Sequence, residues 1–180
     1  MRHHAWSTWA EIAIEQEAIA GAARGTDPMQ ELKPSLLAIT SAAFALDALY
    51  AVGKDLGIRD AGAKARWKNV ARVVQQGMTR EHAPPDCRAR IHDLLKRRDE
   101  AVHFGEKDAA PVPHPAMGGA RVAVEHYKWR LEEANRAVDL VLEILSAWAE
   151  HPSAASKKWA EDYRRAVEGA LQYRQDRRPP

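Results

Sequence analysis

Residues 87–105 read CRARIHDLLKRRDEAVHFG, and this stretch decides the fold class. Its apolar residues return at spacings of three and four, which on a helix gathers them on one side. The pattern predicts an amphipathic helix that starts around Pro84, ends near His103 or Phe104, and is closed by Gly105. The apolar stripe of this helix, with Arg98 near its middle, consists of Cys87, Ile91, Leu94, Leu95, Ala101 and Val102.

Arg98 is the unusual member of this stripe. A guanidinium group stays charged, and removing it from water without a partner is costly. We therefore expect Arg98 to have either a partner carboxylate or a role in a site. Asp99 follows it directly and His103 comes five residues after it. Asp99 and His103 are four residues apart, so on a helix they are neighbours, and a carboxylate there would favour the protonated imidazole.

The helical pattern continues on both sides of this stretch. Pro34 is expected to mark the first turn of the second helix, and a short extended stretch is expected at 121–124. Long amphipathic helices joined by short turns pack as an antiparallel bundle. The sequence therefore predicts an all-α domain of about five to six helices over residues 1–175, followed by a frayed tail at 176–180. The further expected helices cover residues 5–24, 29–56, 61–76, 125–150 and 154–175.

Composition narrows the class of protein. The chain has 180 residues, a formal net charge of +2 and a single cysteine, Cys87. One cysteine excludes a disulfide framework and a thiolate metal cluster, and it fits a reducing cytoplasm. No apolar run approaches the roughly 20 residues that span a bilayer, and no signal-peptide pattern opens the chain, so we expect a cytoplasmic protein with no membrane partner. The tryptophans lie mostly on apolar faces and are expected in the core.

The familiar motifs of cofactor and metal chemistry are missing. The sequence has no glycine-rich phosphate loop, no His-Glu-x-x-His and no cysteine pair at metal-binding spacing. His114 and His126 bracket a proline-rich loop, but no third ligand stands at a plausible spacing. We therefore expect neither a metal nor a cofactor.

The run Arg98-Asp99-Glu100-Ala101-Val102-His103 resembles the signature of the HEPN superfamily. That signature is Arg-x(4–6)-His, often with a polar residue after the arginine, at the end of the fourth helix of an all-α bundle. Here Leu94-Leu95 precede it and Phe104-Gly105 follow it. The resemblance covers about residues 30–150 as architecture and is specific only around this helix. A second match, Arg121 to His126, lies at a loop-to-helix junction, and we interpret it as coincidence.

The resemblance implies metal-independent cleavage of RNA, in which the ribose 2′-OH attacks the adjacent phosphate and leaves a 2′,3′-cyclic phosphate. His103 would move the proton, and Arg98 would stabilise charge on the phosphoryl oxygens. Asp99 would orient His103, and Lys96 and Arg97 would hold flanking phosphates. Members of the superfamily commonly form homodimers through this face, which brings two Arg/His sets into one cleft.

The family also implies a biological setting. The expected partners are an RNA substrate, a second copy of the chain, and an antitoxin or defence-system protein, as in a toxin or phage-defence effector. In toxins paired with a minimal nucleotidyltransferase antitoxin, a tyrosine two residues after the histidine is modified. Gly105 occupies that position here, so the chain departs from that subgroup.

Two other interpretations remain open. In the first, Arg98 serves only as half of a structural ion pair, with Asp47 on the second helix as the candidate partner, while His103 caps its helix. In that case the chain would be a catalytically inactive HEPN-like module that binds a protein partner or a nucleotide. The third interpretation is an unrelated helical bundle that serves protein interaction.

Overall fold

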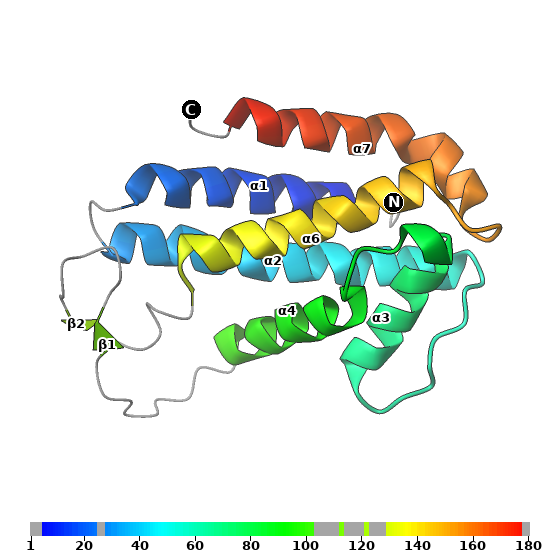
Figure 1. Cartoon of the computed structure of the whole chain (residues 1–180), viewed down its shortest axis with the longest axis horizontal. Helices are drawn as coiled ribbons and strands as arrows, with labels where there is room; N and C mark the ends of the chain where they lie inside the picture. Colours follow the sequence, from blue (N-terminus) through cyan, green and yellow to red (C-terminus); the bar gives the residue numbers. More distant parts are fainter. Residues whose placement is uncertain (1–4, 25–27, 103–111, 114–120, 123–128, 178–180) are drawn as a thin grey trace.

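The computed structural model describes residues 5–24, 28–102, 112–113, 121–122 and 129–177. A 3₁₀ turn at Arg80–His82 precedes α4, and the two-residue strands β1 (Val112–Pro113) and β2 (Arg121–Val122) pair in antiparallel fashion. The predicted all-α bundle is confirmed (Figure 1). The helices of the described part are α1 (Ala5–Ala23), α2 (Pro28–Asp55), α3 (Arg66–Gln76), α4 (Cys87–Val102), α6 (Leu131–Glu150) and α7 (Lys157–Arg177).

Helices α2 and α6 form the centre of the bundle. Helix α2 packs against α1, α3, α4 and α6, and α6 packs against α1, α2, α4 and α7. Figure 1 shows α1, α2, α6 and α7 running side by side, with α4 along one edge and α3 inclined to the rest. Helix α4, which carries Arg98, therefore packs against both central helices from one edge of the bundle.

The central position of α2 explains its composition. The 26-residue stretch Gln30–Asp55 is long and apolar enough to cross a membrane by those two criteria, so the expectation that no segment reaches that length was wrong. Ile39, Leu46 and Leu49 on this helix are fully buried against its neighbours. A helix surrounded by four others needs apolar residues on most of its sides, and such a helix meets the same criteria as a membrane span.

Helix α3 begins later than predicted, at Arg66 instead of residue 61. Gly62 has a φ of +58°, a left-handed backbone that interrupts a right-handed helix. The Asn69 side chain bonds the backbone of Ala63 twice, accepting from its N–H at 3.0 Å and donating to its carbonyl at 2.8 Å. These side-chain bonds hold the preceding loop against the helix, so the first turn predicted there is replaced by an ordered loop.

The predicted range of α2, residues 29–56, is confirmed within one residue at each end, but Pro34 lies inside the helix and does not mark its first turn. The end of α7 differs from the prediction. Helix α7 continues to Arg177, past the predicted start of the frayed tail, and Gln172 donates to the Asp176 carboxylate at 2.7 Å. Prolines and termini are ambiguous signals because packing against neighbouring helices can extend a helix past them.

The segment before α6 is described only in part. The predicted extended stretch at 121–124 is confirmed for Arg121–Val122, and residues 123–124 lie outside the described residues. The helix predicted to start at 125 begins at Leu131, and residues 125–128 also lie outside the described part. The buried Glu31 carboxylate on α2 accepts the Leu131 N–H at 2.9 Å, which satisfies one of the open donors at the start of α6.

The core confirms the prediction for four of the six tryptophans. Trp6, Trp129, Trp148 and Trp159 are at most 3% exposed. Trp148 donates from its indole nitrogen to the Val74 carbonyl at 2.8 Å, which ties α6 to α3. The same ring requires glycine at Gly77, because a Cβ there would lie 2.0 Å from a ring carbon.

Candidate functional site around Arg98

Helix α4 buries the stripe that the sequence predicted. Cys87, Ile91, Leu94 and Leu95 are at most 4% exposed and face the core. Arg98 continues this side of the helix toward its C-terminal end, and its side chain is 14% exposed. The structure therefore places a guanidinium on the inward side of α4, as the spacing predicted.

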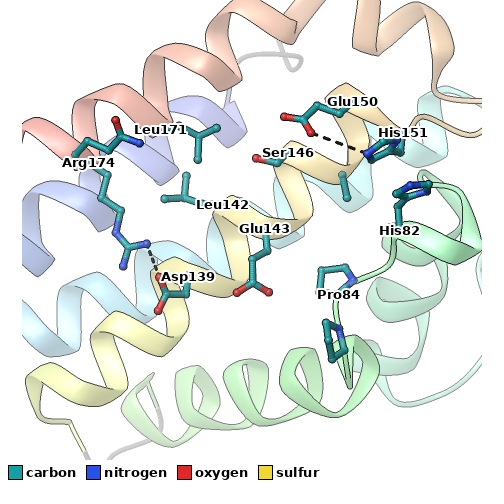
Figure 2. Close-up of a pocket in the computed structure, with 13 residues that line it drawn as sticks. His82, Pro84, Asp139, Leu142, Glu143, Ser146, Glu150, His151, Leu171 and Arg174 are labelled. Atoms are coloured by element: carbon teal, nitrogen blue, oxygen red, sulfur yellow. Dashed lines mark hydrogen bonds and ion pairs between the residues drawn. The ribbon is translucent and has the colours of Figure 1, made fainter.

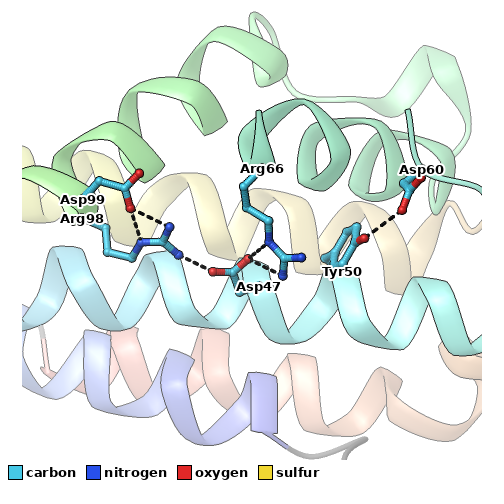
Figure 3. A network of polar contacts seen from close by, with 6 residues as sticks. All are labelled: Asp47, Tyr50, Asp60, Arg66, Arg98 and Asp99. Atoms are coloured by element: carbon cyan, nitrogen blue, oxygen red, sulfur yellow. Dashed lines mark hydrogen bonds and ion pairs between the residues drawn. The ribbon is translucent and has the colours of Figure 1, made fainter. Parts of the chain in front are cut away.

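Two carboxylates hold Arg98 (Figure 3). Its Nη1 donates to Oδ2 of Asp47 on α2, and its Nε and Nη2 donate to Oδ1 of Asp99 at 3.0 and 2.7 Å. Burial alone would lower the pKa of Arg98, but the hydrogen bond to Asp99 and the charge of Asp47 outweigh it and raise the pKa above its usual value. The ion pair with Asp47, which the structural interpretation named, is confirmed within a single chain.

Asp47 also joins α2 to α3. Its Oδ1 accepts from Nε and Nη2 of Arg66 at 3.1 and 3.0 Å. The Arg66 guanidinium lies over the Tyr50 ring, 4.2 Å from its centroid. The four charged residues Asp47, Arg66, Arg98 and Asp99 make up what we term the Arg98 network, and their formal charges sum to zero.

The network continues to the loop before α3. The Tyr50 hydroxyl donates to Oδ2 of Asp60 at 2.9 Å, and Lys54 lies 3.1 Å from the same oxygen. Burial raises the pKa of Tyr50, and the hydrogen bond to Asp60 adds to the rise. The hydrogen bond from the Gly62 N–H is the main cause that lowers the pKa of Asp60. The loop at 57–65 is thereby linked to Arg98 through the contacts of Tyr50 and Asp47 on α2.

The geometry defines what Arg98 can do chemically. A guanidinium has five N–H donors, and its contacts with described residues use three of them. The two donors that remain, one on each Nη, have fixed directions because the rest of the group is held. The two nearby carboxylates weaken the attraction of Arg98 for an anion, so the network offers direction more than net positive charge.

The structure brings together only some of the predicted site residues. Asp99 lies beside Arg98 and is 59% exposed. His103 lies outside the described residues, so its predicted contact with Asp99 stays a prediction. In the described part of the chain, Asp99 acts as a partner of the arginine.

Lys96 and Arg97 are not grouped with Arg98. Lys96 is 65% exposed and lies 3.9 Å from the Glu100 carboxylate on the same helix. Arg97 reaches the Glu133 carboxylate of α6 at 3.1 Å. Consecutive residues on a helix are about 100° apart, so the side chains of Lys96, Arg97 and Arg98 contact different groups. Their role in binding RNA phosphates stays a prediction.

Away from the Arg98 network, a hollow lies between α6, α7 and the turn before α4 (Figure 2). It has a volume of about 650 Å³, and Lys96, Arg97, Arg98 and Asp99 are not among its lining residues. At one end the rings of His82 and His151 stack with their centroids 3.5 Å apart. In Figure 2 both rings lie at the right, with Glu150 beside His151.

Two of the three carboxylates that line this hollow have arginine partners. Asp139 contacts Arg174, and Glu143 receives two hydrogen bonds from Arg90, at 2.6 and 3.2 Å. Leu142 and Leu171 provide an apolar floor between these pairs. The hollow therefore presents two carboxylate–arginine pairs around apolar surface, and its third carboxylate, Glu150, lies 4.0 Å from the His151 ring.

A second interior arginine, Arg174, was not predicted from the sequence. Arg174 on α7 donates from Nε and Nη2 to Glu17 of α1 at 2.9 and 2.6 Å and from Nη1 to Asp139 of α6. The side chains of Arg174 and Glu17 are each 9% exposed. The signal was present, since Glu17 lies at helical spacing from Ala10, Ala13 and Ala20 on the buried side of α1. Glu17 is thus a charged residue on an apolar stripe, which is the same pattern that marks Arg98.

Comparison of the chain with protein-family models, with curated proteins and with solved structures gave no match. Within the described residues, no group of three histidine, cysteine, aspartate or glutamate side chains is placed to hold a metal ion.

Proposed function

We propose that this protein is a metal-independent endoribonuclease of the HEPN type that acts as a homodimer. The observation that carries the proposal is the held guanidinium of Arg98 at the C-terminal end of α4, five residues before His103. Three hydrogen bonds fix this group, and two N–H donors keep defined directions. A charge that is positioned before the substrate arrives needs no rearrangement when negative charge develops on a phosphate.

The roles follow from the chemistry of each group. Arg98 would stabilise the developing charge on the phosphoryl oxygens. His103 would take the proton of the attacking 2′-OH or protonate the leaving 5′-oxygen, a contribution of about 10²–10⁴-fold. Asp99 would act on both neighbours, since it contacts Arg98 and is one helical turn before His103. Asp47 would be a positioning residue, because it acts through Arg98.

The homodimer is part of the proposal because one helix does not aim both groups at one atom. Arg98 and His103 are five residues apart, which on an ideal helix separates them by about 140° around the axis and about 7–8 Å along it. A second chain related by a twofold axis would bring the arginine of one copy toward the histidine of the other. We also propose that the protein acts in the cytoplasm as a toxin or phage-defence effector and needs no metal or cofactor. Its expected partner is an antitoxin or defence protein.

The test is cleavage of single-stranded RNA by the purified protein in EDTA. DNA of the same sequence should survive because it lacks the 2′-OH. His103→Ala should reduce cleavage by about 10²–10⁴-fold while the circular dichroism spectrum and the dimer are retained. His82→Ala, which removes a histidine of the other hollow, is the matched control and should cleave like the parent. Full activity of His103→Ala would refute the proposal.

One observation favours a second candidate function. The ion pair between Arg98 and Asp47 lies within a single chain, as expected for a structural residue in a catalytically inactive module that binds a protein partner or a nucleotide. Under this alternative, Arg98→Ala lowers stability and no preparation of the protein cleaves RNA. Cleavage by the parent chain that is lost in a folded Arg98→Ala variant would exclude it.

A further inference from the structure

The charge balance of the Arg98 network raises the question of where an RNA strand would first bind. Binding of nucleic acid depends on cations whose charge is available to phosphates. Arg98 and Arg66 share Asp47, Arg97 contacts Glu133, and Lys96 lies near Glu100. The cations of this region therefore offer a phosphate little net charge.

A different group of side chains lies where α3 meets α4 (Figure 1). Trp67, in the first turn of α3, faces His92 of α4 with ring centroids 4.4 Å apart. The charged ends of Lys68 and Arg88 each lie over the Trp67 ring, 5.6 Å from its centroid. We term these four residues the Trp67 patch.

The cations of the Trp67 patch differ from those of the Arg98 network. Lys68 and Arg88 are exposed, and neither forms an ion pair with any residue of the described part of the chain. The carboxylates nearby are Asp93, which lies 3.4 Å from the His92 ring nitrogen, and Asp86, which lines the adjacent hollow. Neither carboxylate forms an ion pair with Lys68 or Arg88, so the charge of both cations is available.

The patch also has a space beside it. Trp67, Arg88 and His92 line a hollow of about 520 Å³, together with Pro84 and Gln75. An indole face, a planar guanidinium and an imidazole are the groups on which a nucleobase stacks, and unneutralised cations follow the phosphates. An acidic peptide would use the cations but has no need of the aromatic face, so the combination favours a nucleic acid.

We infer that the Trp67 patch binds single-stranded RNA and delivers it to the Arg98 network. The inference rests on the proposed ribonuclease function for its substrate, and it assigns that substrate's binding surface. The two regions are built on the same pair of packed helices, because Arg66 of the network and Trp67 both stand on α3 while Arg98 and His92 both stand on α4. A base would stack on Trp67, and neighbouring phosphates would contact Lys68 and Arg88.

The test is equilibrium binding of a labelled single-stranded RNA of about 10 nucleotides, read by fluorescence anisotropy over a range of salt concentrations. Every ribose carries a 2′-O-methyl group, so the strand cannot be cleaved and binding is separated from catalysis. Trp67→Ala should weaken binding about tenfold with little change in the salt dependence, because it removes stacking. Trp67→Phe, which keeps an aromatic face, should retain most of the affinity.

The double variant Lys68→Gln/Arg88→Gln should weaken binding about tenfold and also reduce the slope of log K against log salt by about 1.4, for two lost phosphate contacts. The matched control Lys157→Gln/Arg165→Gln removes the same charges from exposed positions on α7 and should leave the slope unchanged. These glutamine variants change exposed residues, so they keep the test valid if Trp67→Ala fails to fold.

The outcomes separate this inference from the function itself. If the patch variants bind like the parent, or if the α7 control loses as much slope, the inference is wrong even when the protein cleaves RNA. If the patch variants lose binding but the parent cleaves no unmodified RNA in EDTA, the inference stands and the ribonuclease proposal fails. Binding of polyglutamate to the patch in place of RNA would overturn the inference in favour of an acidic protein partner.

Discussion

Arg98 and Arg174 are both interior arginines held by two carboxylates, yet they are built into the molecule differently. Arg174 joins three helices, because its carboxylates come from α1 and α6 while it stands on α7. Arg98 joins two, because Asp47 lies on α2 and Asp99 is its own neighbour on α4. Asp47 also contacts a second cation, Arg66, and its side chain is 20% exposed. The side chains of Glu17 and Arg174 are each only 9% exposed.

The comparison teaches that an arginine on an apolar stripe is not by itself a sign of catalysis. Arg174 meets that criterion as well as Arg98 does, and no motif surrounds it. What distinguishes Arg98 is its position, with His103 five residues later at the same helix end. The following predictions therefore change the two arginines, their carboxylates or a buried neutral group, and ask which property each one controls.

The largest expected difference is catalytic. Arg98→Ala should lower RNA cleavage by about 10²–10³-fold, since it removes a positioned charge from the proposed transition state. Arg174→Ala, assayed under conditions where it is folded, should keep the parent rate. Rates measured with the same RNA in EDTA would decide this, and equal losses in the two folded variants would break the comparison.

The next difference is in stability, where we expect the larger loss at Arg174 and the smaller loss at Arg98. Arg174→Met should lower the free energy of unfolding by about 3 kcal/mol, because it takes the guanidinium from a carboxylate inside the protein. Arg98→Met should cost about 1 kcal/mol, because Asp47 keeps its contact with Arg66 and is 20% exposed. Urea titrations followed by circular dichroism measure both, with the exposed Arg165→Met as a control within about 0.5 kcal/mol of the parent.

A stability loss for Arg98→Met as large as that for Arg174→Met would indicate that both arginines serve the same structural purpose. The double variant Glu17→Gln/Arg174→Met should recover part of the loss, because it also removes the carboxylate charge. No such recovery would mean that packing of the arginine stem, and not its charge, holds α7 in place.

Asp47 allows a finer test of positioning. Asp47→Asn should lower kcat about tenfold with little change in KM, since Arg98 would lose one of its two anchors while the substrate surface is intact. Asp139→Asn is the matched change beside Arg174 and should leave kcat unchanged. An unchanged kcat in Asp47→Asn would remove Asp47 from the proposed site.

The smallest effect concerns a buried ionisable group that has no ion pair within the described residues. Burial raises the pKa of the Cys87 thiol from 9.0 to about 11, so this group is neutral where both arginines stay charged. The unfolded chain releases the thiol proton first as pH rises above 9. The free energy of unfolding should therefore fall by about 1 kcal/mol by pH 10 in the parent relative to Cys87→Ala. Parallel pH profiles for the two proteins would contradict the raised pKa.

Much of the fold followed from short-range patterns. The buried side of α4 was readable because side chains at spacings of three and four share a face whatever surrounds the helix. The late start of α3 was not readable, since it depends on the Asn69 side chain bonding the loop before it. The range of α2 was predicted within one residue, but the extent of its apolar stretch was underestimated, because that composition reflects contact with four neighbours that are distant in sequence.

The residues of the candidate site were likewise predictable only in part. The sequence named Arg98, Asp99 and Asp47, and the structure joins these three. It did not identify Arg66 or the Trp67 patch, whose members come from two helices and gain meaning only from their distances to one another. An exposed lysine or arginine looks the same in a sequence whether or not a carboxylate faces it.

The sequence alone determined that this protein is a helical bundle and that an arginine would occupy the inward side of its fourth helix. Both follow from helical periodicity, which acts over a few residues. Tertiary structure alone decided which cations are neutralised and which remain available, because that depends on carboxylates brought together from separate helices. Arg98 and Arg174 are matched by such carboxylates, and Lys68 and Arg88, among the described residues, are not.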